Sequence, residues 1–192
     1  DRFAELISKV RKDSTVKAVV LRVNSPGGSV VASSKIKTEL DLLRESVPVI
    51  ASYGNYAASG GYWISANTDK IFSNATTLTG SIGVFSMIPD ISGALKNKLH
   101  VNVTTVNSNT HSDIYTLIKP LDAAETAYMQ ASVEDIYDRF TSIVAEGRDM
   151  TVEEVDAIAQ GRVWTGAEAE GIGLVDQIGT LTDALEYAAI SI

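Results

Sequence analysis

The sequence predicts an α/β domain, and three observations support this prediction. Two short segments rich in β-branched and apolar residues, 16–23 and 47–52, have the composition of buried strands. Each is followed by a turn or loop rich in small residues and then by a helical pattern. Strands that alternate with helices favour parallel β-α units with right-handed crossovers. We therefore expect a parallel sheet built from such units.

The chain opens on a helical pattern and continues into the first predicted strand. Apolar residues recur at spacings of three and four, at Phe3, Leu6, Ile7 and Val10. Because the chain starts without Met and directly on this pattern, we expect it to be a fragment that lacks upstream sequence. The strand over residues 16–23 ends at a turn, residues 24–28, and a second helix is expected over residues 29–45.

The turn after the first strand contains Gly27 and Gly28. Taken alone, a Pro-Gly-Gly sequence merely reverses the chain. Here it joins a strand to a helix, and such a joint leaves backbone N–H donors without partners at the carboxyl end of the sheet. The sequence therefore predicts an anion-binding edge at this turn.

The second predicted β-α unit contains Ser59, the main candidate for a catalytic residue. A strand over residues 47–52 leads to a small-residue segment, 57–66, that is expected to be helical. A serine at this strand-to-helix turn can project its hydroxyl into a cleft. The N–H groups of Gly60 and Gly61 then point out of the helix N-terminus, where partial positive charge favours an oxyanion. Ser59 is therefore predicted to be a nucleophile.

A second serine, Ser81, lies in a β-branched run over residues 76–85 that is interrupted by Gly80 and Gly83. Glycines in such a run are expected where the backbone approaches another backbone or a ligand. The local pattern leaves open whether Ser81 is functional or an ordinary turn residue. The elements expected around this run are a strand over 70–73, a helix over 89–99, a strand over 101–106 and an exposed polar loop over 107–116.

The final third of the sequence is predicted to be mainly helical. A long amphipathic pattern covers residues 122–147, and Thr151 with Glu154 forms a capping-box pattern at the start of another helix. The remaining expected elements are a short strand and turn at 163–166, a helical turn at 167–170, a small-residue turn and edge at 171–176 and a helix over 182–189.

Size and charge restrict the possible functions. The 192 residues, 45% of them hydrophobic, fit one globular domain over residues 1–192. The net charge of −8, without a cluster of basic residues, makes a nucleic-acid partner unexpected. The absence of cysteine excludes disulfides, thiolate metal sites and a cysteine nucleophile. No apolar run reaches the length of a membrane-spanning helix.

A serine nucleophile needs a base, and the sequence offers few. The two histidines, His100 and His111, lie in contexts typical of surface residues, and their spacing matches no metal-binding pattern, so neither a metal nor a cofactor is expected. The remaining base is lysine. Burial lowers the pKa of a lysine amine, which can then accept the proton of a serine hydroxyl.

Five ordered segments resemble the signal peptide peptidase A (protease IV) family of serine peptidases: 24–28, 57–65, 78–83, 159–166 and 173–176. The resemblance implies a ClpP/crotonase-like fold of repeated β-β-α units. It also implies that Ser59 is the nucleophile, that the amides of Gly28 and Gly60 form the oxyanion hole, and that the Ser81 hydroxyl steadies a lysine amine. A bacterial enzyme is implied, associated with the membrane on its extracytoplasmic side, that forms homo-oligomers and degrades cleaved signal peptides.

The sequence departs from this family at the expected lysine. In short family members the lysine follows a histidine in the loop after the strand equivalent to residues 101–106, whereas this chain has Ser112 after His111. Long members are tandem duplications whose amino-terminal half supplies the lysine and whose carboxyl-terminal half supplies the serine. The chain is similar to that second half, so the lysine is expected from a missing amino-terminal half. Lys119, the nearest lysine in sequence, is the alternative.

Two other functions stay open at this point. The crotonase-like fold also occurs in acyl-CoA enzymes, which use two backbone amides as an oxyanion hole without a nucleophile. Ser59 could instead be only a small residue that permits tight helix packing in a non-catalytic assembly domain.

Overall fold

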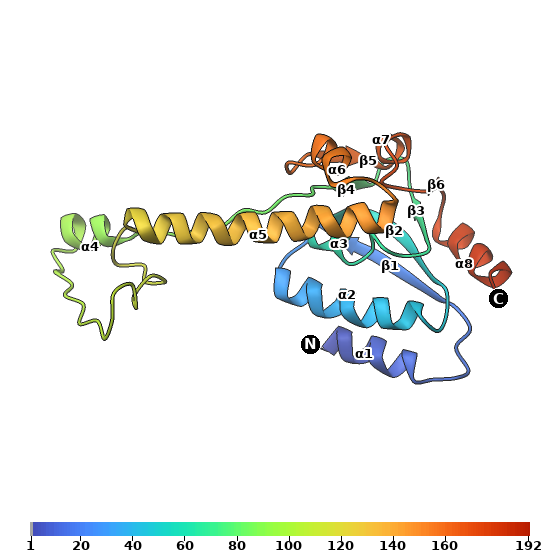
Figure 1. Ribbon diagram of the computed structural model, residues 1–192, viewed down its shortest axis with the longest axis horizontal. Coiled ribbons are helices and arrows are strands. Elements are labelled where there is room, and N and C mark those ends of the chain that lie inside the picture. The colour runs from blue at the N-terminus through green and yellow to red at the C-terminus, as the bar shows by residue number, and fades with distance from the viewer. Residues whose placement is uncertain (1) are drawn as a thin grey trace. The chain divides into compact units, whose positions relative to one another are not determined.

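The computed structural model describes residues 2–192, and contacts divide the chain into two compact units (Figure 1). Unit 1 comprises Asp1–Gly83 and Tyr137–Ile192, and unit 2 comprises Val84–Ile136. Unit 2 is thus inserted between the two segments of unit 1. That residues 1–192 make up a single peptidase domain stays a prediction.

Unit 1 contains a six-stranded sheet whose central strand is β2. The strands are β1 (Val19–Ser25), β2 (Val49–Ala58), β3 (Lys70–Ser73), β4 (Leu78–Gly80), β5 (Val163–Thr165) and β6 (Gln177–Ile178). β2 pairs in parallel with β1 along one edge and with β3 and then β4 along the other. β6 continues the sheet in parallel beside β3, whereas β5 is antiparallel to β4. The predicted parallel α/β architecture is confirmed.

The helices of unit 1 pack around this sheet. They are α1 (Arg2–Arg11), α2 (Val30–Arg44), α3 (Gly60–Trp63), α6 (Val152–Ile158), α7 (Gly166–Gly171), α8 (Leu181–Ile190) and the carboxyl-terminal part of α5 (Ala123–Arg148). α1 packs against α2, while α8 packs against β1, β2 and β3 (Figure 1). The helices α6, α7 and α8 each begin at a capping box, so their N-terminal N–H groups are satisfied locally.

The core of unit 1 is formed by β2 and the helices against it. Residues Val49, Ile50 and Ala51 are fully buried, and burial of each large aliphatic side chain stabilises the fold by about 1.5–3 kcal/mol. Two buried tyrosines satisfy their hydroxyls internally. Tyr62 Oη donates to the carbonyl of Leu174 at 2.8 Å, and Tyr53 Oη lies 2.8 Å from Ser65 Oγ. These bonds fix β2 and α3, which carry Ser59 between them.

Unit 2 contains α4 (Ser92–Lys98) and the first part of α5. The strand predicted over residues 101–106 is wrong: no strand occurs in residues 84–136, all of which the structure describes. Val101, Val103 and Val106 are exposed, so the β-branched residues that suggested a strand have no sheet to join. None of the helices over residues 2–192 is both long and apolar enough to cross a membrane.

The predicted helix over residues 57–66 is also largely wrong. β2 continues to Ala58, and only Gly60–Trp63 form a helix. Pairing of β2 with β4 extends the strand, because Tyr56, Ala57 and Ala58 pair with Leu78, Thr79 and Gly80. The strand-to-helix turn therefore consists of Ser59 alone.

Candidate active site

Ser59 occupies a strained backbone conformation between β2 and α3. Its φ of 51° and ψ of −121° lie where residues with a side chain are rare. The Ser59 amide donates to the carbonyl of Gly80 at 2.9 Å, and its own carbonyl accepts from the amides of Tyr62 and Trp63. Its hydroxyl neither caps α3 nor forms a hydrogen bond with any residue from 2 to 192. This is the geometry of a nucleophile elbow, in which a sharp turn presents a free hydroxyl.

Close approach of two turns explains the glycines around Ser59. A Cβ on Gly27 would lie 2.7 Å from Ser59 Cβ, and one on Gly61 would lie 2.6 Å from the carbonyl oxygen of Ser25. A Cβ on Gly60 would lie 2.6 Å from Ser33 Oγ. The turn after β1 and the turn after β2 are therefore in direct backbone contact, as parallel neighbours in one sheet permit.

Two backbone amides beside Ser59 have no acceptor. Within the described part of the chain, neither the Gly28 N–H nor the Gly60 N–H donates a hydrogen bond. The Gly28 nitrogen lies 3.2 Å from the position that a Cβ on Gly60 would take, so the two residues are neighbours in space. Gly28 is exposed, and its φ of 152° is one that glycine adopts freely. Unpaired N–H groups in such a position can bind an oxyanion.

Ser81 lies close to Ser59 through the sheet. Ala58 of β2 pairs with Gly80 of β4, so the two serines follow paired residues at the carboxyl ends of parallel strands. Ser81 also has a positive φ, 48°, and its amide donates to the carbonyl of Arg162 at 2.7 Å. Its hydroxyl forms no hydrogen bond with residues 2–192 and is free to bind another group. The structure thus brings the four predicted site residues, Gly28, Ser59, Gly60 and Ser81, to one edge of the sheet.

Lys119 does not have the properties of a general base. It belongs to unit 2, where its ammonium group lies 2.8 Å from both Asp113 Oδ1 and Glu125 Oε1. Hydrogen bonds to Asp113 and Glu125 raise the pKa of Lys119 to about 12. The amine is therefore protonated at neutral pH and cannot accept a proton from serine. Ser112, where the resemblance led us to expect a lysine in short family members, is an exposed residue of the same unit.

The ion pairs of Lys119 are part of a cluster that the sequence did not predict. His111 Nδ1 lies 3.1 Å from Glu125 Oε1 and 3.4 Å from Asp122 Oδ2, and the Glu125 side chain is fully buried. Ligand atoms of these three residues lie within 4.8 Å of one another, a spacing that could accommodate a metal ion, but the Lys119 ammonium already binds Glu125. The sequence signal for this cluster was Asp122, whose carboxylate accepts from the amide of Glu125 at the start of α5.

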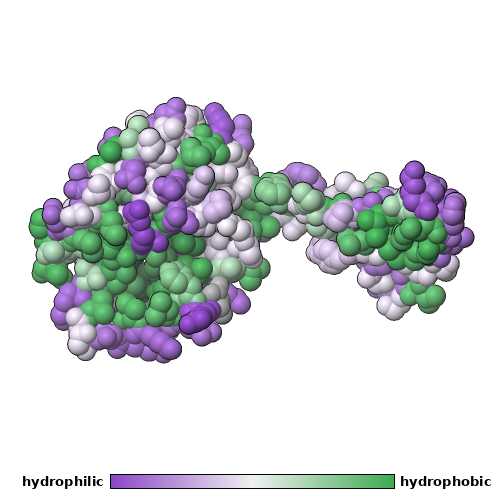
Figure 2. Space-filling model, turned by 180° about the vertical axis from the view of Figure 1, so that it is seen from behind, coloured by the Kyte–Doolittle hydropathy of each residue, from purple (hydrophilic) through white to green (hydrophobic). Residues whose placement is uncertain are grey.

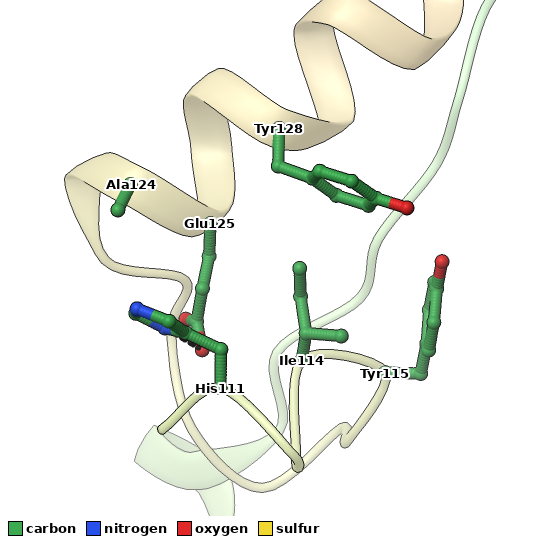
Figure 3. Close-up of a pocket in the computed structure, with 6 residues that line it drawn as sticks. All are labelled: His111, Ile114, Tyr115, Ala124, Glu125 and Tyr128. Atoms are coloured by element: carbon green, nitrogen blue, oxygen red, sulfur yellow. Dashed lines mark hydrogen bonds and ion pairs between the residues drawn. The ribbon is translucent and has the colours of Figure 1, made fainter. Parts of the chain in front are cut away.

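An apolar pocket of about 270 Å³ adjoins the cluster within unit 2. Figure 3 shows the side chains of Ile114, Tyr115 and Tyr128 around it, with His111 beside Glu125 at one end. Both carboxylate oxygens of Glu125 have partners: Oε1 contacts His111 and Lys119, and Oε2 accepts from the Asp122 amide. The pocket therefore presents mainly apolar and aromatic surface, and the Glu125 carboxylate at its end is already engaged.

Comparison with known proteins identifies the family. Residues 41–191 match peptidase family S49. The chain is 43% identical over 189 residues to protease 4 of Haemophilus influenzae and 45% identical over 190 residues to protease 4 of Salmonella typhi, covering 98% of this chain and 30% of each relative. It is 40% identical over 185 residues to a putative signal peptide peptidase SppA of Enterococcus faecium, covering 96% of this chain and 54% of the relative.

A solved structure confirms the fold predicted from the resemblance. A ClpP1 mutant from Listeria monocytogenes superimposes with a TM-score of 0.62 at 18% identity, over 96% of this chain and 88% of that one. The chain spans less than a third of the protease 4 sequences it matches. The ClpP-like fold and the family predicted from the resemblance are confirmed, and the chain belongs to peptidase family S49.

Proposed function

We propose that this chain is the serine-bearing part of a Ser-Lys peptidase that degrades cleaved signal peptides and other apolar peptides. The observation that carries the proposal is the free hydroxyl of Ser59, held at a strained turn beside the unpaired amides of Gly28 and Gly60. A nucleophile next to two orphan donors is the arrangement that acyl transfer requires.

The proposed reaction proceeds in two steps. A neutral lysine accepts the Ser59 proton as Oγ attacks the scissile carbonyl carbon, and the carbonyl electrons move to oxygen, where the amides of Gly28 and Gly60 hold the oxyanion. Collapse of this intermediate breaks the C–N bond, and the lysine returns the proton to the leaving amine. Water then hydrolyses the Ser59 ester by the same route. Each oxyanion donor contributes about 3 kcal/mol.

The lysine is proposed to come from an amino-terminal half that is not part of this chain. Within the described residues, the alternative Lys119 is held protonated by Asp113 and Glu125. The protease 4 relatives are more than three times as long as the matched segment, which leaves room for a second half. The free Ser81 hydroxyl is proposed to accept a hydrogen bond from the incoming lysine amine and so to steady it.

The proposal extends to the substrate, the location and the assembly of the enzyme. One relative is named a putative signal peptide peptidase, which supports signal peptides as substrates. We propose, from the resemblance of the sequence to the family, that the whole enzyme is anchored to the bacterial membrane on its extracytoplasmic side. Unit 2 exposes Phe85, Met87 and Val106, and Figure 2 shows apolar side chains on its visible face. Exposed apolar side chains of this kind support homo-oligomerisation.

The test compares this chain alone with the chain supplied together with its amino-terminal half. We expect almost no peptide hydrolysis from the chain alone, and hydrolysis with covalent labelling by a serine-directed phosphonate when the half is present. Labelling should disappear in Ser59→Ala. Strong activity of the chain alone that survives Lys119→Ala would overturn the donated lysine. Micromolar binding of acyl-CoA by calorimetry, with no hydrolysis in either sample, would overturn the peptidase itself.

A further inference from the structure

The turn over residues 159–162, between α6 and β5, holds the backbone of Ser81. The Ser81 amide donates to the carbonyl of Arg162 at 2.7 Å, and the carbonyl of Ile82 accepts from the amide of Gly161 at 2.9 Å. A Cβ on Gly83 would lie 2.7 Å from the Gly161 Cα, so the two segments are in van der Waals contact. Ser81 therefore takes its unusual φ of 48° while bonded to this turn.

The side chain of Arg162 fixes the same turn to the end of α6. Its guanidinium donates from Nε to the carbonyl of Ala159 at 3.0 Å and from Nη2 to the carbonyl of Ala157 at 2.5 Å. Trp164 Nε1 donates to the carbonyl between them, that of Ile158, at 3.0 Å. The last carbonyls of a helix lack partners within the helix, and a cation is favourable there. The α6 C-terminus is thus capped by the side chains of β5 and its preceding turn.

We propose that Arg162 is a positioning residue for Ser81, acting through its own main chain. The guanidinium closes the turn onto α6, and the Arg162 carbonyl, which this closure orients, holds the Ser81 amide. Ser81 is thereby held at the same edge of the sheet as Ser59. This inference rests on the proposed function, because it matters only if the Ser81 hydroxyl contacts the catalytic lysine.

Loss of the Arg162 guanidinium should change the position of Ser81 more than the stability of the fold. The backbone pairing of β4 with β5 remains, so the fold is retained, but the turn can move relative to α6. Displacement of a catalytic group by about 1 Å can lower a rate up to a hundredfold. A change at Arg162 should therefore mimic a change at Ser81 without removing the Ser81 hydroxyl.

The experiment is a double-mutant cycle in the complete S49 protein that contains this chain. It uses Arg162→Ala, Ser81→Ala and the double variant, with Arg139→Ala as the matched control. Arg139 is an exposed arginine of α5 that forms no hydrogen bond or ion pair with residues 2–192. We expect Arg162→Ala to lower kcat roughly tenfold with KM unchanged, and Arg162→Lys to recover part of the loss. The double variant should be no slower than Ser81→Ala, because residues that act as one unit are not additive.

The pH profile of kcat/KM separates positioning from a merely structural role. One limb of this profile reflects the pKa of the catalytic lysine. Arg162→Ala should shift that limb in the same direction as Ser81→Ala does, whereas Arg139→Ala should not shift it. Additive losses in the cycle, or an unmoved pH profile, would overturn the inference. If Ser59→Ala retained activity, the proposed nucleophile would fail instead, and if Ser81→Ala alone had no effect, the role of Ser81 would fail.

Discussion

The guanidinium of Arg148 binds both carboxylate oxygens of Asp176, with Nη2 2.7 Å from Oδ1 and Nη1 3.1 Å from Oδ2. Arg148 Nε also donates to the carbonyl of Gly173, and Asp176 Oδ2 accepts from the amide of Ile71. This bidentate pair joins the end of α5 to β3 and to the segment before β6. Since the Arg148 side chain is only 8% exposed, its charge depends on Asp176 for compensation.

Asp176→Asn is expected to destabilise the fold by about 3 kcal/mol, because it leaves a buried guanidinium without a counter-charge. Urea unfolding followed by circular dichroism measures the loss. Asp138→Asn is the matched control, since Asp138 is an exposed residue of α5 whose side chain has no partner in the described part of the chain. Equal effects of the two substitutions would contradict the structural role of the pair.

The same pair predicts how stability changes in acid. Burial by itself would raise the pKa of Asp176, but the hydrogen bonds and charge of Arg148 outweigh it and lower the pKa below 3.8. A depressed carboxyl pKa contributes stability that is present above the unfolded-state value and is lost as pH falls through the folded-state value. We therefore expect the wild-type protein to lose more stability than Asp176→Asn as the pH falls below about 4. Parallel pH curves for the two proteins would refute this.

The stability of unit 2 should depend on the ionised Glu125 carboxylate, as that of unit 1 depends on Asp176. The Lys119 hydrogen bond and then the Asp122 amide lower the pKa of Glu125 to about 2, so its stabilising contribution is present above 4.5 and lost as pH falls toward 2. Glu125→Gln is expected to speed amide hydrogen exchange in residues 111–128. Glu134→Gln, which changes an exposed glutamate of the same helix, should not. The readout is exchange followed by mass spectrometry at pH 7.

The elements that the sequence predicted well are those determined by local pattern. The turn at Ser59 follows from an apolar strand that meets two glycines, and the capping box at Thr151 is visible in four residues. The features that the sequence did not predict depend on contacts between residues that are far apart in the sequence. Residues 101–106 have strand composition but no strand to pair with. Pairing with Gly80 extends β2 to Ala58, and the bond from Ser81 to Arg162 joins residues 81 positions apart.

Gly60→Ala is expected to lower the peptidase activity strongly without unfolding the protein. The new Cβ would lie 2.6 Å from Ser33 Oγ and 3.2 Å from the Gly28 nitrogen, so the two proposed oxyanion donors must move apart. Loss of one donor corresponds to a fall in kcat of about 100-fold or more. Gly93→Ala is the control, because a Cβ there meets nothing within 4 Å. Adding Ser33→Ala should restore part of the activity by removing the closer contact, and full activity of Gly60→Ala would contradict the assignment.

Ser59→Gly is expected to stabilise the protein while it removes activity. The φ of 51° and ψ of −121° at Ser59 cost a residue with a side chain about 1–3 kcal/mol, whereas glycine adopts such values freely. Glycine also gains freedom in the unfolded chain, which offsets about 0.4–1 kcal/mol of the benefit. Ser59→Ala separates the two effects, because it removes the hydroxyl but keeps the Cβ and therefore the strain. Thermal unfolding should give a higher Tm for Ser59→Gly than for Ser59→Ala, with both variants inactive in the complete protein. A lower Tm for the glycine variant would mean that the turn stores no strain.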